Sequence, residues 1–116
     1  MANWCSNIVT FHGDKIQVNR TMFLFKQLER KEEAENKGQL PDFISAEDGY
    51  FFEIWTLANI LNYETRWSPN TDVLKQVADH FKVEFLYEYV EPMNGIHGKI
   101  AYRNGVLTKT DRKFKT

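Results

Sequence analysis

The residues suited to nucleophilic or metal chemistry are few, and they are widely spaced. The chain has one cysteine, Cys5, and three histidines. Cys5 shares one face of a predicted strand with Val9 and Phe11, where a thiol is normally buried and unreactive, whereas His12 falls on the opposite face. No two of these residues have the i,i+2 to i,i+4 spacing of metal ligands. The sequence therefore predicts no catalytic residue, no metal site and no cofactor, and the protein is not expected to be an enzyme.

Two other polar groups also lack catalytic spacing. Glu84 and Glu88 lie on one face of a predicted strand, but four residues of strand separate them by about 13 Å, too far for a joint acid–base pair. They are expected to form a solvated acidic stripe.

The segment 94–98 contains two glycines and a histidine, which could form an anion-binding nest. A flexible loop is the favoured interpretation, because the lysine and following helix of a phosphate-binding loop are missing.

The segment Trp67-Ser68-Pro69 marks the point where a strand passes into a helix. The structural interpretation is a buried Trp67 followed by a helix that Ser68 caps and Pro69 begins. The alternative is a recognition corner in which Trp67 joins Trp4 and Arg66, since aromatic and arginine side chains dominate interface hot spots. We expect partner binding at this corner, with acidic residues around it. The predicted partner-binding residues are Trp4, Glu64, Arg66, Trp67, Glu84 and Glu88.

Hydrophobic periodicity predicts the elements that must position these residues. Strands are expected at residues 4–12, 50–57, 60–67 and 83–90, and a hairpin at 99–103 and 106–109 across Asn104-Gly105. Asp14 is expected to cap a first helix, and a second follows Ser68. The apolar stripe of the first helix ends at Leu28, so its polar remainder is expected to project past the core and to be mobile.

The element order βαββαββ predicts an α+β domain. Its βαββαβ part is the ferredoxin-like split βαβ arrangement, here with an added C-terminal hairpin strand: one antiparallel sheet with two helices on one face. Residues 1–110 are expected to form a single domain, and 111–116 a basic tail. The expected core consists of Val9, Phe11, Val18, Met22, Phe25, Leu28, Tyr63, Val77, Phe81, Phe85 and Tyr87.

Two segments resemble a known family. Asn3-Trp4-Cys5-Ser6-Asn7, followed by an apolar strand and Gly13, and Tyr63-Glu64-Thr65-Arg66-Trp67-Ser68-Pro69 are similar to the opening and the Thr-x-Trp-Ser-Pro element of a family from phages, prophages and conjugative plasmids. The resemblance covers roughly residues 3–105, including Gly98, but the Trp-Gly-Thr-Lys-Trp type segment of that family is reduced here to Ile54-Trp55-Thr56. It implies a ferredoxin-like domain of unknown function and a mobile-element origin, with no activity attached.

Charge and composition narrow the function classes. Residues 38–98 carry ten carboxylates against three cations, a net charge of −7, and residues 99–116 carry six cations against one carboxylate, a net charge of +5. The single cysteine and the lack of a signal-peptide pattern or a long apolar stretch predict a cytoplasmic protein with no membrane partner. The predicted open sheet face carries Asn62, Glu64, Glu84, Leu86 and Glu88. The negative charges of its three glutamates repel phosphate groups.

These features favour a small non-enzymatic accessory binding protein of a phage or mobile element. It would act by occupying a host or viral protein, for example as an inhibitor of a host defence system. The alternative is a nucleic-acid-binding module that uses the basic C-terminal tail. A small-ligand-binding protein or an enzyme of unrecognised type ranks third.

Overall fold

The computed structural model describes residues 3–113. The elements in chain order are β1 (Trp4–His12), α1 (Lys15–Glu35), β2 (Phe52–Leu57), β3 (Ile60–Arg66), α2 (Thr71–Phe81), β4 (Glu84–Glu91), β5 (Ile96–Arg103) and β6 (Val106–Lys113), with one 3-10 turn at Pro92–Asn94. The segments predicted as strands and helices are confirmed, but the order is βαββαβββ, because the C-terminal hairpin adds two strands to βαββαβ and not the one of the predicted order. Asp14 caps α1, because its carboxylate accepts a hydrogen bond from the backbone N–H of Gln17.

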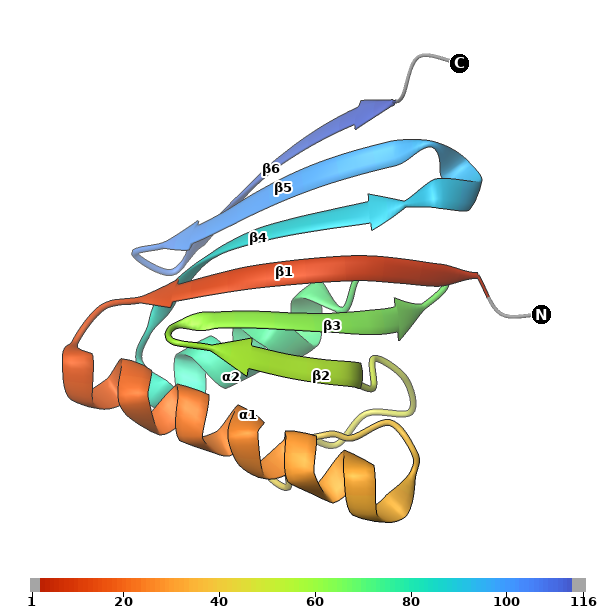
Figure 1. The fold of residues 1–116 in the computed structure, drawn as a ribbon. Helices are drawn as coiled ribbons and strands as arrows, with labels where there is room; N and C mark the ends of the chain where they lie inside the picture. Colours follow the sequence, from red (N-terminus) through yellow and green to blue (C-terminus); the bar gives the residue numbers. More distant parts are fainter. Residues whose placement is uncertain (1–2, 114–116) are drawn as a thin grey trace.

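The six strands form one antiparallel sheet in the order β2-β3-β1-β4-β5-β6, and both helices lie on the same side of it (Figure 1). Strand β3 is inserted between β1 and β2, which is the split βαβ arrangement. Strands β5 and β6 continue the sheet beyond β4 as a hairpin. The predicted α+β, ferredoxin-like fold is therefore confirmed, with β1 in the middle of the sheet.

The core lies between the sheet and the two helices. Nine of the predicted core residues are buried, while Val18 and Phe81 pack against the core and are partly buried. Phe85 has no exposed surface, so the predicted register of β4 is confirmed. The opposite face of the sheet is uncovered: Ile8 and Leu86, on the outward side of β1 and β4, are 39% and 43% exposed.

The prediction that α1 projects past the core after Leu28 is wrong. The helix continues for two further turns along β2 and ends at Asn36, whose backbone is left-handed. The Glu32 carboxylate accepts hydrogen bonds from the backbone N–H groups of Glu53 and Ile54, and that of Glu29 accepts one from the Thr56 hydroxyl. Polar contacts with β2 thus replace the apolar stripe that ends at Leu28.

The start of α2 also differs from the sequence-based expectation. The residue before its first turn is Asn70 instead of Ser68, and its side chain makes no capping hydrogen bond. The Asn70 amide is engaged in tertiary contacts: its oxygen accepts from the Tyr63 hydroxyl at 2.6 Å, and its nitrogen donates to the Gly49 carbonyl at 2.9 Å. Asn70 therefore ties α2 to β3 and to the loop before β2.

Part of the predicted basic tail is a strand. Strand β6 extends to Lys113 and pairs with β5 along its whole length, so residues 111–113 belong to the sheet. The remainder of the predicted tail, residues 114–116, lies outside the described residues.

Candidate functional site

The two sequence segments that carry the family resemblance lie next to each other in the fold. Trp4 pairs with Arg66 and Cys5 with Thr65 in the ladder between β1 and β3. Beyond the ladder, the backbone N–H of Trp67 donates to the Asn3 carbonyl at 2.6 Å. The first motif and the Thr-x-Trp-Ser-Pro element therefore meet at one end of the sheet and fasten β1 to the turn that precedes α2.

A buried hydrogen-bond network explains the polar residues of both motifs. The Asn7 amide nitrogen donates to the Cys5 and Tyr63 carbonyls and to the Thr65 hydroxyl oxygen, at 2.9, 3.2 and 3.1 Å. Its amide oxygen accepts from the Tyr87 hydroxyl. Such a network compensates the desolvation of each buried group, so it stabilises one register of the central strands.

Cys5 belongs to this buried region. Its side chain has no exposed surface, and burial raises the pKa of its thiol to about 11. At neutral pH the group is a thiol and not the nucleophilic thiolate. The predicted burial of Cys5 is thus confirmed.

Trp67 is the exception among the motif residues. Of its two interpretations, the one that buries Trp67 at the sheet edge is wrong, because its side chain is 57% exposed. Its backbone has a φ of 71°, a left-handed conformation that bulky residues rarely adopt and that is held here by the hydrogen bond to Asn3. The turn therefore presents the indole to solvent and does not bury it at the sheet edge.

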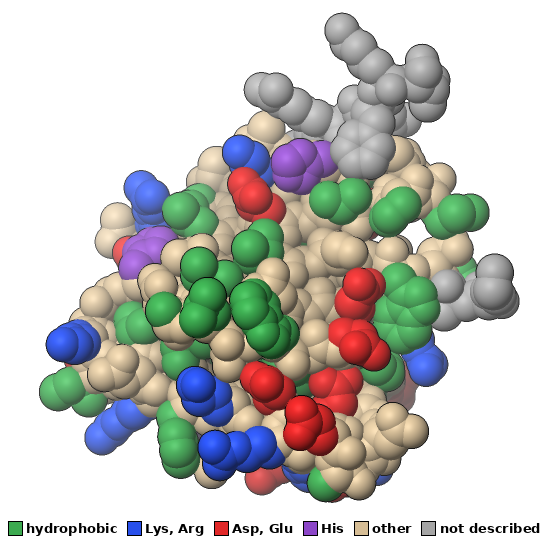
Figure 2. Space-filling view, viewed as in Figure 1, with side chains coloured by type: hydrophobic (Ala, Val, Ile, Leu, Met, Phe, Trp, Pro, Cys, Tyr) green, Lys and Arg blue, Asp and Glu red, His purple; other side chains and the backbone are tan. Residues whose placement is uncertain are grey.

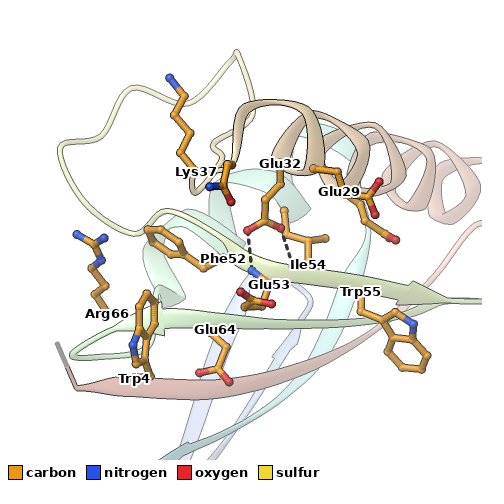
Figure 3. A pocket seen from close by; sticks show the side chains of 12 residues that line it. Trp4, Glu29, Glu32, Lys37, Phe52, Glu53, Ile54, Trp55, Glu64 and Arg66 are labelled. Atoms are coloured by element: carbon orange, nitrogen blue, oxygen red, sulfur yellow. Dashed lines mark hydrogen bonds between the residues drawn. The ribbon is translucent and has the colours of Figure 1, made fainter. Parts of the chain in front are cut away.

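A cleft opens beside this corner (Figure 3). It lies between the C-terminal half of α1 on one side and, on the other, strand β2, the start of β1 and the end of β3. Its volume is about 930 Å³. The lining combines three aromatic residues with five glutamates, two cations and two further side chains. These are Trp4, Phe52 and Trp55; Glu29, Glu32, Glu33, Glu53 and Glu64; Arg66 and Lys37; and Asn36 and Ile54. Figure 2 shows acidic side chains gathered on this part of the surface next to hydrophobic ones.

A β-bulge in β2 shapes the floor of the cleft. The register of β2 against β3 shifts between Phe52 and Trp55, and Glu53 adopts a left-handed φ of 52°. The two backbone N–H groups at the bulge donate to the Glu32 carboxylate at 2.7 and 2.9 Å. This clamp from α1 holds Glu53 in a conformation that non-glycine residues rarely adopt, with Glu53 lining the cleft.

The aromatic wall of the cleft already holds one cation. The Arg66 guanidinium lies 5.6 Å from the Trp4 ring centroid and 4.9 Å from that of Phe52. The two rings contact each other edge to face, with centroids 5.1 Å apart. Arg66 is therefore held by cation–π contacts, and it forms no ion pair with a carboxylate of the described residues.

None of the five glutamates of the cleft forms an ion pair with a described residue, and the charges of two of them, Glu53 and Glu64, lie close enough to interact. Figure 3 shows Glu53 and Glu64 between Trp4 and Trp55. Burial raises the pKa of Glu64, a hydrogen bond from Ser6 lowers it, and the nearby charge of Glu53 raises it again. Neither residue forms an ion pair within the described chain. The arrangement suits an incoming cation that can also contact aromatic rings, such as a guanidinium or ammonium side chain.

The predicted site residues divide into two groups. Trp4, Glu64 and Arg66 line the cleft together, and Trp67 follows Arg66 directly. The expectation that Glu84 and Glu88 surround this corner is wrong. Each lies on β4, where Glu84 is 3.9 Å from the His12 ring nitrogen and Glu88 is 3.3 Å from the Lys99 ammonium. Since β4 is antiparallel to β1, the pairing that puts Glu88 beside Ile8 puts Glu84 beside His12, at the far end of β1 from Trp4.

Sequence reasoning missed the contributions of α1 and β2 to the cleft. Glu29, Glu32 and Phe52 come from segments that only the tertiary fold brings to Trp4. The one sequence feature that hinted at them is the run of glutamates after Leu28, which continues a helix without an apolar stripe. Such a run indicates a helix face with polar tertiary partners.

Comparison with known families gives a match over residues 48–114, to the ferredoxin-like domain in Api92-like protein. The chain belongs to this family. The match covers more than half of the chain, from the loop before β2 through β6, and agrees with the suspected family and fold. A comparison with curated proteins finds no match.

Two further observations concern possible ligands and membranes. Within residues 3–110, no group of three or more histidine, cysteine or carboxylate side chains is arranged to hold a metal ion. Neither helix among the described residues is long and apolar enough to span a bilayer.

Proposed function

We propose that the protein is a small, non-enzymatic accessory binding protein of a phage or other mobile genetic element. It acts by occupying a host or viral protein, and it binds a basic segment of that partner in the cleft beside Trp4. The observation that carries the proposal is the pair of carboxylates, Glu53 and Glu64, that faces solvent between aromatic rings without an internal cation.

The chemistry of the cleft supports an arginine or lysine side chain as the group that is bound. A guanidinium carries N–H donors only, and it can donate charge-assisted hydrogen bonds to both carboxylates at once. The neighbouring Trp4 and Trp55 rings offer apolar faces for its flat surface and alkyl stem. Partial burial of Glu64 strengthens such a contact relative to a fully solvated pair.

A second feature supports binding through a preformed surface. The Glu32 clamp and the Trp4–Phe52–Arg66 stack fix the cleft walls before any partner arrives. Preorganised side chains lose less conformational entropy on binding, so more of the contact energy appears as affinity. The mobile-element setting rests on the family resemblance alone.

The test is capture of a partner from host lysate by the purified chain, compared with a matched variant. Glu53→Gln combined with Glu64→Gln removes both charges with little change in shape, and Glu88→Gln removes an exposed carboxylate outside the cleft. Loss of a stoichiometric basic partner with the double variant, and its retention with Glu88→Gln, would support the proposal. The dissociation constant should then rise about tenfold or more, since each lost charged contact costs at least 1 to 2 kcal/mol.

Other outcomes would assign a different function. Equal capture by the wild type and the double variant would exclude the cleft as the binding site. Binding of a random single-stranded oligonucleotide at physiological salt, weakened by deletion of the residues after Lys109, would favour the nucleic-acid alternative. Turnover within a metabolite panel would show an enzyme.

A further inference from the structure

The solvent-facing side of α1 carries a second surface, separate from the cleft. Ile16 and Phe23 lie two turns apart on this helix and are 63% and 62% exposed. Together with Leu24, Arg20 and the α2 residue Phe81 they line a groove of about 590 Å³ between the two helices. Single exposed apolar side chains are common on protein surfaces, but here Ile16 and Phe23 share one groove with Leu24 and Phe81, and such a contiguous apolar patch is typical of an interaction site.

Charge is strongly segregated on α1. No carboxylate occurs in residues 15–28, whereas Lys15, Arg20 and Lys26 are all exposed there. Helical spacing continues the same outward stripe from Phe23 to Arg30 and Lys31, both exposed. The glutamates of α1 follow Leu28, and Glu29 and Glu32 turn toward β2, as their hydrogen bonds show.

The cations of this stripe are not neutralised within the fold. None of Arg20, Arg30 and Lys31 forms an ion pair with another described residue. The groove therefore presents an apolar floor with one unpaired cation, Arg20, in its lining, and Arg30 and Lys31 lie about one helical turn beyond Gln27 on the same side of α1. A ligand that complements both properties has one apolar face and negative charges beside it.

We propose that this groove binds an acidic amphipathic helix of a partner protein. The groove runs from Ile16 to Gln27, twelve residues that span about 17 Å of helix, which matches three turns of a docked helix. Apolar residues at i, i+3 or i+4, and i+7 of that helix would contact Ile16, Phe23 and Phe81, and its glutamates or aspartates would face Arg20, Arg30 and Lys31.

Two other occupants fit the surface less well. A second copy of the chain would bring the same cations against each other across a two-fold axis, which is repulsive. A nucleic-acid backbone offers phosphates but no apolar face for Phe23 and Ile16. An anionic bilayer offers both properties, so vesicles serve as a competing probe.

The experiment selects peptides of roughly 15 residues, long enough for about 22 Å of helix, from a random display library on the full-length protein. Enriched peptides should share apolar residues at the stated spacing together with several carboxylates. Their affinity should fall about tenfold or more for Phe23→Ser and for Arg20→Glu, as expected for hot-spot residues. Both side chains are exposed, so neither variant should unfold the domain.

Matched controls separate this groove from the cleft. Met93→Ser changes a side chain that is 71% exposed and lies outside the groove, and Trp4→Ala alters the cleft. Both should keep the affinity for the selected peptides within about twofold, because neither residue touches the groove. A failure of the cleft proposal would appear instead in the capture experiment, as equal capture of a partner by the wild type and the Glu53→Gln, Glu64→Gln double variant.

Several results would overturn the inference. They are enrichment of basic peptides whose binding Phe23→Ser weakens, binding of acidic peptides that Phe23→Ser leaves unchanged, and no enrichment of acidic amphipathic peptides. Vesicles of phosphatidylserine and phosphatidylcholine and a single-stranded oligonucleotide are tested in parallel. Binding of either probe that depends on Phe23, without an acidic peptide, would assign the groove to a membrane or to nucleic acid and refute the peptide helix.

Discussion

Replacement of Glu32 by glutamine should destabilise the domain and loosen the cleft together. The carboxylate accepts two backbone hydrogen bonds at the β2 bulge, at 2.7 and 2.9 Å. A hydrogen bond to a charged group contributes about 1.5 to 3 kcal/mol to stability. Because these two bonds are partly exposed to solvent, we expect each to contribute about 1.5 kcal/mol or less. Glutamine keeps one acceptor but turns an amide donor toward the second N–H, so we expect a loss of about 2 kcal/mol in unfolding free energy.

That loss is measurable in urea denaturation, because a domain of this length has a stability of about 6 to 17 kcal/mol. Glu33→Gln is the matched control. The Glu33 side chain is exposed and makes no hydrogen bond with a described residue, so this substitution should change the unfolding free energy by no more than about 0.5 kcal/mol. Hydrogen exchange provides a local readout, since the amides of Glu53 and Ile54 should exchange faster in Glu32→Gln. Equal stability of the two variants and unchanged exchange at the bulge would refute the clamp.

Three further predictions concern buried positions. Phe85→Ala should lower the unfolding free energy by about 3 to 5 kcal/mol in denaturant titration, because the side chain is fully buried; an effect below about 1 kcal/mol would contradict the register of β4. Gly98→Ala should cost about 1 to 3 kcal/mol in the same assay, since a Cβ there would lie 2.0 Å from the Tyr89 ring; a neutral substitution would mean that the ring moves freely. Cys5 should react slowly with iodoacetamide at neutral pH in the folded protein, because burial raises the pKa of its thiol to about 11; rapid labelling would show an accessible thiolate.

The sheet could be predicted because its strands alternate in hydrophobicity. In β4, Phe85 and Tyr87 alternate with Leu86 and Glu88, and this period fixes which face is buried. The polar end of α1 could not be predicted in the same way. Its stabilising contacts are hydrogen bonds from Glu29 and Glu32 to β2, and neither partner has a recognisable local pattern.

The candidate site was predictable only in part for a related reason. Trp4 and Arg66 were expected at one corner because antiparallel pairing of two predicted strands brings their ends together. The left-handed backbone at Trp67 and Glu53 was not foreseeable, because in each case a long-range hydrogen bond imposes it. The placement of Glu84 and Glu88 at this corner conflicts with the predicted antiparallel sheet, because an antiparallel β4 puts its start, with Glu84, beside the end of β1 and away from Trp4.

The position of β1 in the sheet affects how the nascent chain folds. Both strands that pair with β1 come much later in the chain: Ser6 pairs with Glu64 and with Val90. At roughly 5 to 20 residues per second, the ribosome needs about 4 to 17 s to add the 84 residues from Ser6 to Val90. Throughout that interval at least one edge of β1 lacks the strand that pairs with it. The domain is thus expected to complete its fold only after β4 has been synthesised, and a chain that stops before β4 would expose β1 to chaperones and proteases.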